Sequence, residues 1–184
     1  MKHRTHARRF GRYRGFTLIE LLVVIAVLAL IATLAAPSFA RMMAKKRIEG
    51  ITSELVTDLQ YARSEAVQQN ARVRVMFGTG CYVIHTEGIS ALSSCSQTGP
   101  STVGAGSKEL KTVQLPSGTA SFSPNGGLPY LQFEPTRGLA VAPGSVDVTS
   151  TSGEWQLRAV VSVVGRVRAC SPNSSVPGYS NNCS

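Results

Sequence analysis

The chain is poor in the residue types that carry most enzyme chemistry, with three histidines, one tryptophan and four cysteines among its 184 residues. It has no glycine-rich phosphate loop, no Gly-x-Ser-x-Gly elbow and no cluster of carboxylates. His85, the one histidine beyond the first six residues, has no obvious serine or cysteine partner in the sequence. The sequence therefore argues against an enzyme and indicates no cofactor.

The four cysteines fit disulfides better than a metal site. The sequence has no Cys-x-x-Cys pair, which is the spacing typical of zinc sites. An even number of cysteines suits an oxidising compartment. Four cysteines allow three pairings, and we favour the pairs that are local in sequence, Cys81 with Cys95 and Cys170 with Cys183.

Acidic residues are absent from the first 19 positions, and the first of them, Glu20, lies inside a long apolar run. Residues 16–36 carry no other charge, and at about 1.5 Å per helical residue they reach roughly 30 Å, the thickness of a bilayer core. A carboxylate in such a span costs about 2.5 kcal/mol or more, so we interpret Glu20 as functional. The alternative is a signal peptide or simple anchor with a stray glutamate near the interface, but the run is too long for a cleaved secretory signal.

The start of this run, Arg14-Gly15-Phe16-Thr17-Leu18-Ile19-Glu20, resembles the N-terminus of prepilins with class III signal peptides, which are the type IV pilins and the pseudopilins of type II secretion. The resemblance implies that a prepilin peptidase cuts between Gly15 and Phe16, that the amino group of Phe16 is then methylated, and that Glu20 serves filament assembly. A carboxylate that meets the ammonium of a neighbouring subunit's Phe16 would replace an unpaired buried charge by a paired one.

The resemblance also implies an α+β, type IV pilin-like fold, in which a long N-terminal helix packs against antiparallel β-sheets. The expected parts are a leader (1–15), the transmembrane half of the helix (16–36), its amphipathic half (37–70) and a β-rich globular domain (71–184). The pattern itself predicts the amphipathic half, because one apolar stripe recurs at spacings of three and four residues. The stripe consists of Ile48, Ile51, Leu55, Leu59, Ala62 and Ala66.

After Asn70 the hydrophobic period changes to two, which predicts short strands. Residues 86–107, rich in serine, glycine and threonine, are expected to form a long loop, and turns are expected at 124–127 and 135–138. The expected strands are 73–77, 81–85, 110–115, 119–123, 131–134, 146–149, 155–161 and 164–170.

The predicted cut changes the charge of the chain. Six of the 19 lysines and arginines precede Phe16 and all ten acids follow it, so the formal net charge falls from +9 to +3. From Ile48 onward, nine basic residues face nine acidic ones, so nucleic-acid binding would need a local patch. The positive leader places the N-terminus in the cytoplasm, which makes the chain a single-pass inner-membrane protein whose globular domain is periplasmic and enters a pilus on assembly.

Such a patch is present after Glu154, the last acidic residue. Gly165-Arg166-Val167-Arg168 resembles the Gly-Arg-x-Arg element of FimT-type minor pilins, which are relatives of the GspH pseudopilins. FimT-type minor pilins are implicated in capturing DNA for natural transformation. The resemblance implies that Arg166 and Arg168, about 7 Å apart on one strand face, bind DNA phosphates without reading sequence, with Arg158 as a further contact. A closed loop between Cys170 and Cys183 is expected to form the rim of this patch.

Other interpretations remain open. The two arginines can simply solvate an edge strand, and the chain can be a GspH-like minor pseudopilin of a type II secretion system. Lys108 and Lys111 form a second basic pair that fits ordinary surface lysines, and Trp155 fits the core better than a base-stacking role. The partners implied are DNA, other pilin subunits, the prepilin peptidase and the inner membrane.

Overall fold

The computed structural model describes residues 15–88, 94–97 and 102–183. Its main helix, α1 (Leu18–Gln68), is 51 residues long and continues through Pro37. The chain divides into two compact units, Met1–Arg41 and Met42–Ser184.

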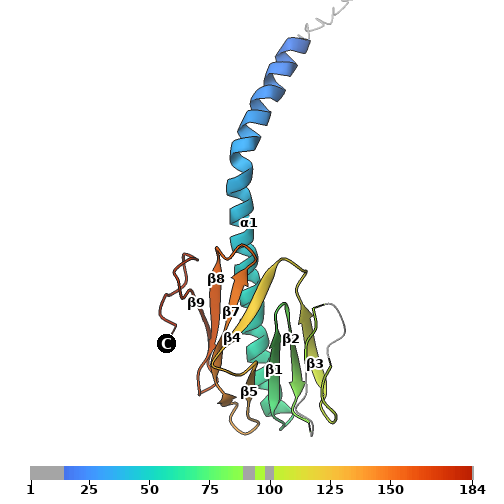
Figure 1. The fold of residues 1–184 in the computed structure, drawn as a ribbon, viewed down its shortest axis with the longest axis vertical. Helices are drawn as coiled ribbons and strands as arrows, with labels where there is room; N and C mark the ends of the chain where they lie inside the picture. The colour runs from blue at the N-terminus through green and yellow to red at the C-terminus, as the bar shows by residue number, and fades with distance from the viewer. Residues whose placement is uncertain (1–14, 89–93, 98–101, 184) are drawn as a thin grey trace, which may run out of the picture. The chain divides into compact units, whose positions relative to one another are not determined.

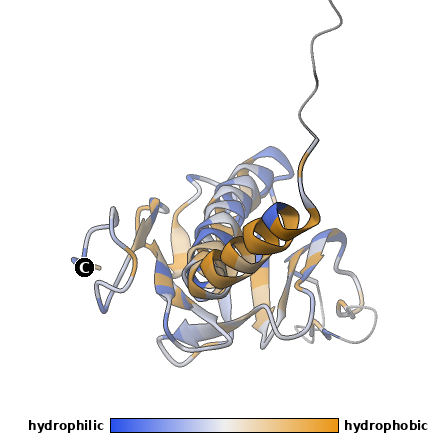
Figure 2. Cartoon of the chain, turned by 90° about the horizontal axis from the view of Figure 1, so that it is seen from above, coloured by the Kyte–Doolittle hydropathy of each residue, from blue (hydrophilic) through white to orange (hydrophobic). Residues whose placement is uncertain are grey.

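In the first unit, all described residues up to Arg41 are exposed. The helix begins beside Thr17, whose Oγ1 accepts a hydrogen bond of 3.2 Å from the backbone N–H of Glu20. Within the described part of the chain, α1 is the one helix long and apolar enough to cross a membrane. Figure 2 shows its N-terminal turns to be mostly hydrophobic, a surface that suits lipid or neighbouring apolar helices.

The second unit holds the whole hydrophobic core, which runs from Ile48 to Val176. The stripe predicted on α1 is the side that packs on this core, although Ile51 is only half-buried. Thr52 and Asp58 are also buried on this side of the helix. Because every buried core residue that the structure describes lies within Met42–Ser184, we expect this unit to fold without the apolar anchor.

Two antiparallel sheets cover the C-terminal half of α1 (Figure 1). The first has the order β3-β2-β1-β5-β6 and the second the order β4-β7-β8-β9. The strands are β1 (Val73–Gly78), β2 (Cys81–Thr86), β3 (Glu109–Gln114), β4 (Ala120–Asn125), β5 (Tyr130–Phe133), β6 (Ala140–Ala142), β7 (Gly144–Ser150), β8 (Gln156–Val161) and β9 (Val167–Cys170).

Besides small shifts of strand ends, three differences from the sequence prediction have a physical reason. Strand β6 was not expected, because three residues are too few to show a periodic pattern. Pro124 and Asn125 belong to β4, where both pair with β7, rather than to the turn after it. Strand β9 begins at Val167 instead of Val164, because a turn occupies the residues before it.

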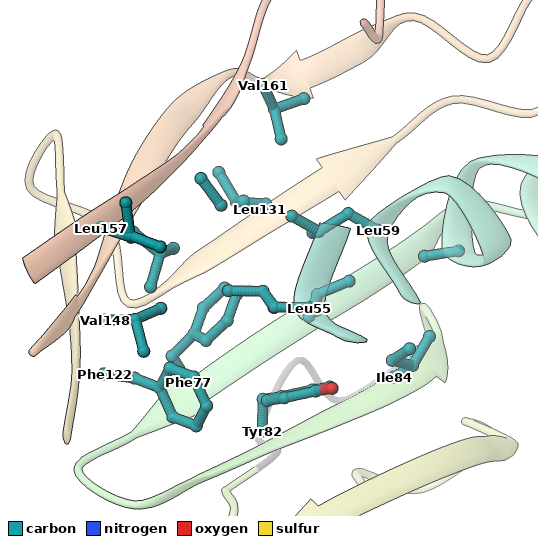
Figure 3. Packing of buried hydrophobic residues seen from close by; sticks show 14 of the residues in the cluster. Leu55, Leu59, Phe77, Tyr82, Ile84, Phe122, Leu131, Val148, Leu157 and Val161 are labelled. Atoms are coloured by element: carbon teal, nitrogen blue, oxygen red, sulfur yellow. The ribbon is translucent and has the colours of Figure 1, made fainter. Parts of the chain in front are cut away.

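The core is built around side chains from α1 and both sheets (Figure 3). Leu55 and Leu59 project from α1 toward the sheets. Phe77, Tyr82 and Phe122 form an aromatic cluster with ring centroids 5.4 to 6.2 Å apart. Tilted and edge-on rings at such distances add about 1 kcal/mol per pair to the stabilisation from burial. This cluster joins the first sheet to the second.

A buried polar cluster also ties α1 to the first sheet. Asp58 is 6% exposed and accepts a hydrogen bond of 2.7 Å from the hydroxyl of Tyr82. The ammonium of Lys111 lies 2.8 Å from the other carboxylate oxygen of Asp58 and 3.5 Å from a carboxylate oxygen of Glu54. The hydrogen bond to Asp58 raises the pKa of Lys111. The cluster satisfies a carboxylate that would otherwise be buried without a partner.

The face of the first sheet turned away from α1 is buried as well. All six residues of β2 are buried, and the Cys81–Cys95 disulfide holds part of the following loop against this face. Glu87 accepts hydrogen bonds of 2.9 Å from both Arg74 and Gln132 on the same face. His85 lies here too, 1% exposed, with Nδ1 2.9 Å from the carbonyl oxygen of Thr86.

His85 should make the stability of this unit depend on pH. Burial lowers the pKa of His85, and the nearby Arg74 lowers it further, while the Thr86 carbonyl, Glu87 and Glu109 act in the opposite direction. The neutral imidazole therefore stabilises the fold above the unfolded pKa of 6.5, and this contribution is lost as the pH falls below it. We expect urea unfolding to show a larger loss of stability from about pH 7.5 to about pH 5.5 in wild type than in His85→Gln. Equal losses in the two proteins would contradict this role.

Candidate functional site

The arginines singled out in the sequence lie at the turn between β8 and β9. Val161 pairs with Val167 in the ladder, and Val160 pairs with Arg168. The backbone N–H of Ser162 donates to the carbonyl oxygen of Arg166 at 3.0 Å, which closes the turn. Arg166 therefore lies in the turn rather than in the strand. Arg168 lies in β9, on the face opposite the buried Val161.

This turn is fixed by a close backbone contact at Gly165. Gly165 has φ of +74°, and a Cβ atom added there would overlap the carbonyl oxygen of Gly138 and lie 2.9 Å from Nε of Arg63. Gly138 also has positive φ, and its carbonyl accepts a hydrogen bond of 2.9 Å from Nε of Arg63. Glycine is required at position 165 because a side chain would be excluded by both conformation and contact. The turns 135–138 and 162–166 thus meet on Arg63 of α1.

The charges of Arg166 and Arg168 are accessible to an anion from solvent. Arg166 and Arg168 are both exposed. Among the ion pairs of the described residues, neither arginine has a carboxylate partner within 4.0 Å. Beside them, Val163 and Val164 are 62% and 61% exposed at the tip of the turn. The arrangement can bind an anion through planar, charged hydrogen-bond donors.

Arg158 is engaged elsewhere. It pairs with Asp147 across β7 and β8, with Nε 2.6 Å from one carboxylate oxygen and Nη2 2.9 Å from the other. Hydrogen bonding to Asp147 raises the pKa of Arg158. Asp147 receives a further hydrogen bond of 2.8 Å from Asn125. A guanidinium held in this bidentate way has a structural role, so the candidate site reduces to Arg166 and Arg168.

The disulfide loop lies away from the turn. The structure pairs Cys170 with Cys183, as favoured from the sequence, and Cys81 with Cys95. However, Ser175 in the closed loop hydrogen bonds to the backbone of Gln156, at the start of β8. The turn with Arg166 lies at the other end of β8, so this loop does not border Arg166, whereas its disulfide lies two residues beyond Arg168 on β9.

The remaining predicted residues are also placed. Gly15 and Phe16 precede α1 and are exposed, and Glu20 lies in the first turn of the helix. The pair Lys108 and Lys111 is split, because Lys111 is bound to Asp58 whereas Lys108 is exposed. Within residues 15–88, 94–97 and 102–183, no group of three or more His, Cys, Asp or Glu side chains could hold a metal ion.

Comparison with known families agrees with this architecture. Residues 52–165 match the family described as Type II transport protein GspH, and residues 11–36 match the prokaryotic N-terminal methylation motif. The chain belongs to the GspH family. Its members are minor pilins and pseudopilins, which are structural proteins that assemble with other pilin or pseudopilin subunits. The methylation motif and the apolar helix mark this GspH-family chain as membrane-anchored.

Solved structures of other proteins are similar to this chain to different degrees. The type IV minor pilin FimU of Pseudomonas aeruginosa is 19% identical, with a TM-score of 0.51, and the match covers 73% of this chain and 95% of FimU. The minor pseudopilin EpsH of the type 2 secretion system of Vibrio cholerae is 14% identical, with a TM-score of 0.49, over 69% of this chain and 98% of EpsH. No curated protein sequence gives a significant match.

Sequence reasoning missed the partners that fix the site. Asp147 was not connected with Arg158, although a hairpin of the two expected strands around a short turn would bring them opposite each other. The contact of Gly165 with Gly138 and Arg63 joins positions far apart in sequence, and no local pattern indicates it.

Proposed function

We propose that this GspH-family chain is a minor pilin of a type IV pilus that binds DNA without sequence preference and serves DNA uptake in natural transformation. The observation that carries the proposal is the exposure of Arg166 and Arg168, free of carboxylate partners in the described structure, at a turn held by Gly165. The turn and β9 fix the backbone of both arginines, so binding has to order only their side chains, and arginine forks match phosphate oxygens.

Binding would rest on the phosphate backbone. Two phosphate contacts give a slope of about −2 in log K against log salt, and only weak binding by one subunit. Several copies in one pilus would raise the effective affinity through multivalency. No base contact is needed, so single sites bind any sequence alike.

Assembly follows from the N-terminal motif. In the proposal, a prepilin peptidase cuts between Gly15 and Phe16, and Phe16 is methylated. Glu20 then pairs with the amino group of a neighbouring subunit in the filament. The N-terminus lies in the cytoplasm and the globular domain in the periplasm until the subunit enters the pilus.

The family description favours a second function, that of a minor pseudopilin in type II protein secretion. This function uses the same anchor, helix and sheets, and it requires no DNA contact. In it, Arg166 and Arg168 would be surface charges that discourage pairing at the edge strand β9.

A deletion of the gene in its own host separates the two functions. We expect the deletion strain to lose DNA uptake, measured as transformants per added marker DNA, while the release of exoproteins stays normal. Returning the wild-type gene to the deletion strain should restore uptake, whereas the Arg166→Gln/Arg168→Gln gene should not. Both proteins should reach the cell envelope in equal amounts. Normal uptake combined with lost exoprotein release would favour the secretion function instead.

A further inference from the structure

We propose that Arg137 belongs to the same DNA-binding surface as Arg166 and Arg168, an inference that rests on the proposed function. Nothing in the sequence connects these residues, because Arg137 follows β5 and the other two belong to the β8–β9 region. The fold brings them together at one end of the globular unit.

The contact between two turns places Arg137. Gly138 and Gly165 touch, and Arg63 Nε lies against both of them. Arg137 directly precedes Gly138, and Arg166 directly follows Gly165. Their Cα atoms therefore lie within roughly 14 Å of each other by chain reach. The backbone N–H of Ala140 also donates to the carbonyl oxygen of Val163 at 3.0 Å, which fixes the two turns side by side.

The charge on Arg137 is accessible. Its side chain is 77% exposed, and its nearest carboxylate oxygen, on Glu134, is 3.9 Å from Nε. This distance is too long for a hydrogen bond, and although Oε1 of Glu134 is buried, the guanidinium of Arg137 is exposed and can turn toward a phosphate. Duplex DNA carries about one negative charge per 1.7 Å of its axis. A duplex that lies across Arg166 and Arg168 thus offers phosphates to Arg137 as well.

The opposite edge of the first sheet provides a matched control. Lys108 is also exposed and precedes β3, at the edge of the sheet farthest from β6. Replacement of either residue by glutamine removes one positive charge from the same unit. A general effect of net charge would act equally at both positions, whereas a phosphate contact acts at Arg137 alone.

The test is a titration of Met42–Ser184 with fluorescently labelled short duplex DNA at several salt concentrations. We expect Arg137→Gln to weaken binding about fivefold and to reduce the magnitude of the salt slope by about 1. Lys108→Gln should change the affinity less than about twofold, and Arg137→Glu should weaken binding more than Arg137→Gln. Thermal unfolding of each variant checks the fold.

The outcomes distinguish this inference from the proposed function. If Arg137→Gln behaves like Lys108→Gln while Arg166→Gln/Arg168→Gln loses binding, the inference fails and the proposed function stands. If adding Glu134→Gln to Arg137→Gln restores wild-type affinity, the loss in Arg137→Gln came from repulsion between DNA and the Glu134 carboxylate. The inference then also fails. If wild type does not bind DNA, both fail.

Discussion

Gly165→Ala is expected to lower the free energy of unfolding by about 3 kcal/mol and to abolish DNA binding. The left-handed conformation alone costs an alanine about 1 kcal/mol or more. The added Cβ would overlap the carbonyl oxygen of Gly138, which is backbone and cannot move aside as a flexible side chain would. The turn must therefore shift, and the positions of Arg166 and Arg168 shift with it.

Gly153→Ala is the matched control for this prediction. Gly153 has φ of +72°, nearly the same as Gly165, but a Cβ there meets nothing within 4 Å. It should therefore show only the conformational cost, about 1 kcal/mol, with DNA binding intact. Urea unfolding and DNA titration of the two variants measure both effects. Equal stability losses in the two variants would show that the contact with Gly138 is unimportant.

Asp58→Ala is expected to destabilise the globular unit by about 3 kcal/mol. The substitution leaves the buried hydroxyl of Tyr82 without its acceptor and removes the main partner of Lys111. Burial and the Asp58 carboxylate both raise the pKa of Tyr82, so the hydroxyl of Tyr82 stays protonated and needs a hydrogen-bond acceptor. Tyr82→Phe removes the same hydrogen bond but leaves less polar surface unpaired, and should cost about 1 kcal/mol.

A double-mutant cycle tests this cluster. Asp58→Ala/Tyr82→Phe should lose less stability than the sum of the two single variants, because the orphaned hydroxyl is then absent. Glu54→Ala provides a control, because Glu54 is 50% exposed. Its carboxylate oxygen lies 3.5 Å from the ammonium of Lys111, farther away than that of Asp58. Glu54→Ala should cost less than about 0.5 kcal/mol by chemical denaturation. Additive losses at Asp58 and Tyr82 would contradict the coupling.

Local periodicity was enough to predict most of the elements but not their contacts. The stripe from Ile48 to Ala66 and the hairpin that begins at Val73 follow patterns of burial within one element, so the sequence reveals them. The buried Asp58 departs from the apolar pattern, and its partners Tyr82 and Lys111 come from two later strands. From the sequence alone, a carboxylate on a helix is expected to face solvent, because partners on distant strands cannot be recognised.

The candidate site was predictable in part for the same reason. The motif at Gly165 to Arg168 is continuous in sequence, and its exposure agrees with its charge. Arg158, like Arg166 and Arg168, is an arginine in a segment predicted as a strand. The register of β7 with β8, however, sets it opposite Asp147. Register depends on pairing between strands, which composition does not show.

The central claim is that Arg166 and Arg168 bind DNA phosphates, and its most direct test is the salt dependence of binding by Met42–Ser184. The control is Arg47→Gln/Lys108→Gln, which removes two exposed positive charges away from the turn. Arg47 lies on α1, 16 residues before Arg63, and Lys108 lies at the edge of the first sheet farthest from β6. We predict a slope of log K against log salt of about −2 to −3 for wild type and the control. For Arg166→Gln/Arg168→Gln we predict a slope closer to zero by about 2, with unchanged unfolding. A double variant that binds with the wild-type affinity and slope would contradict the claim.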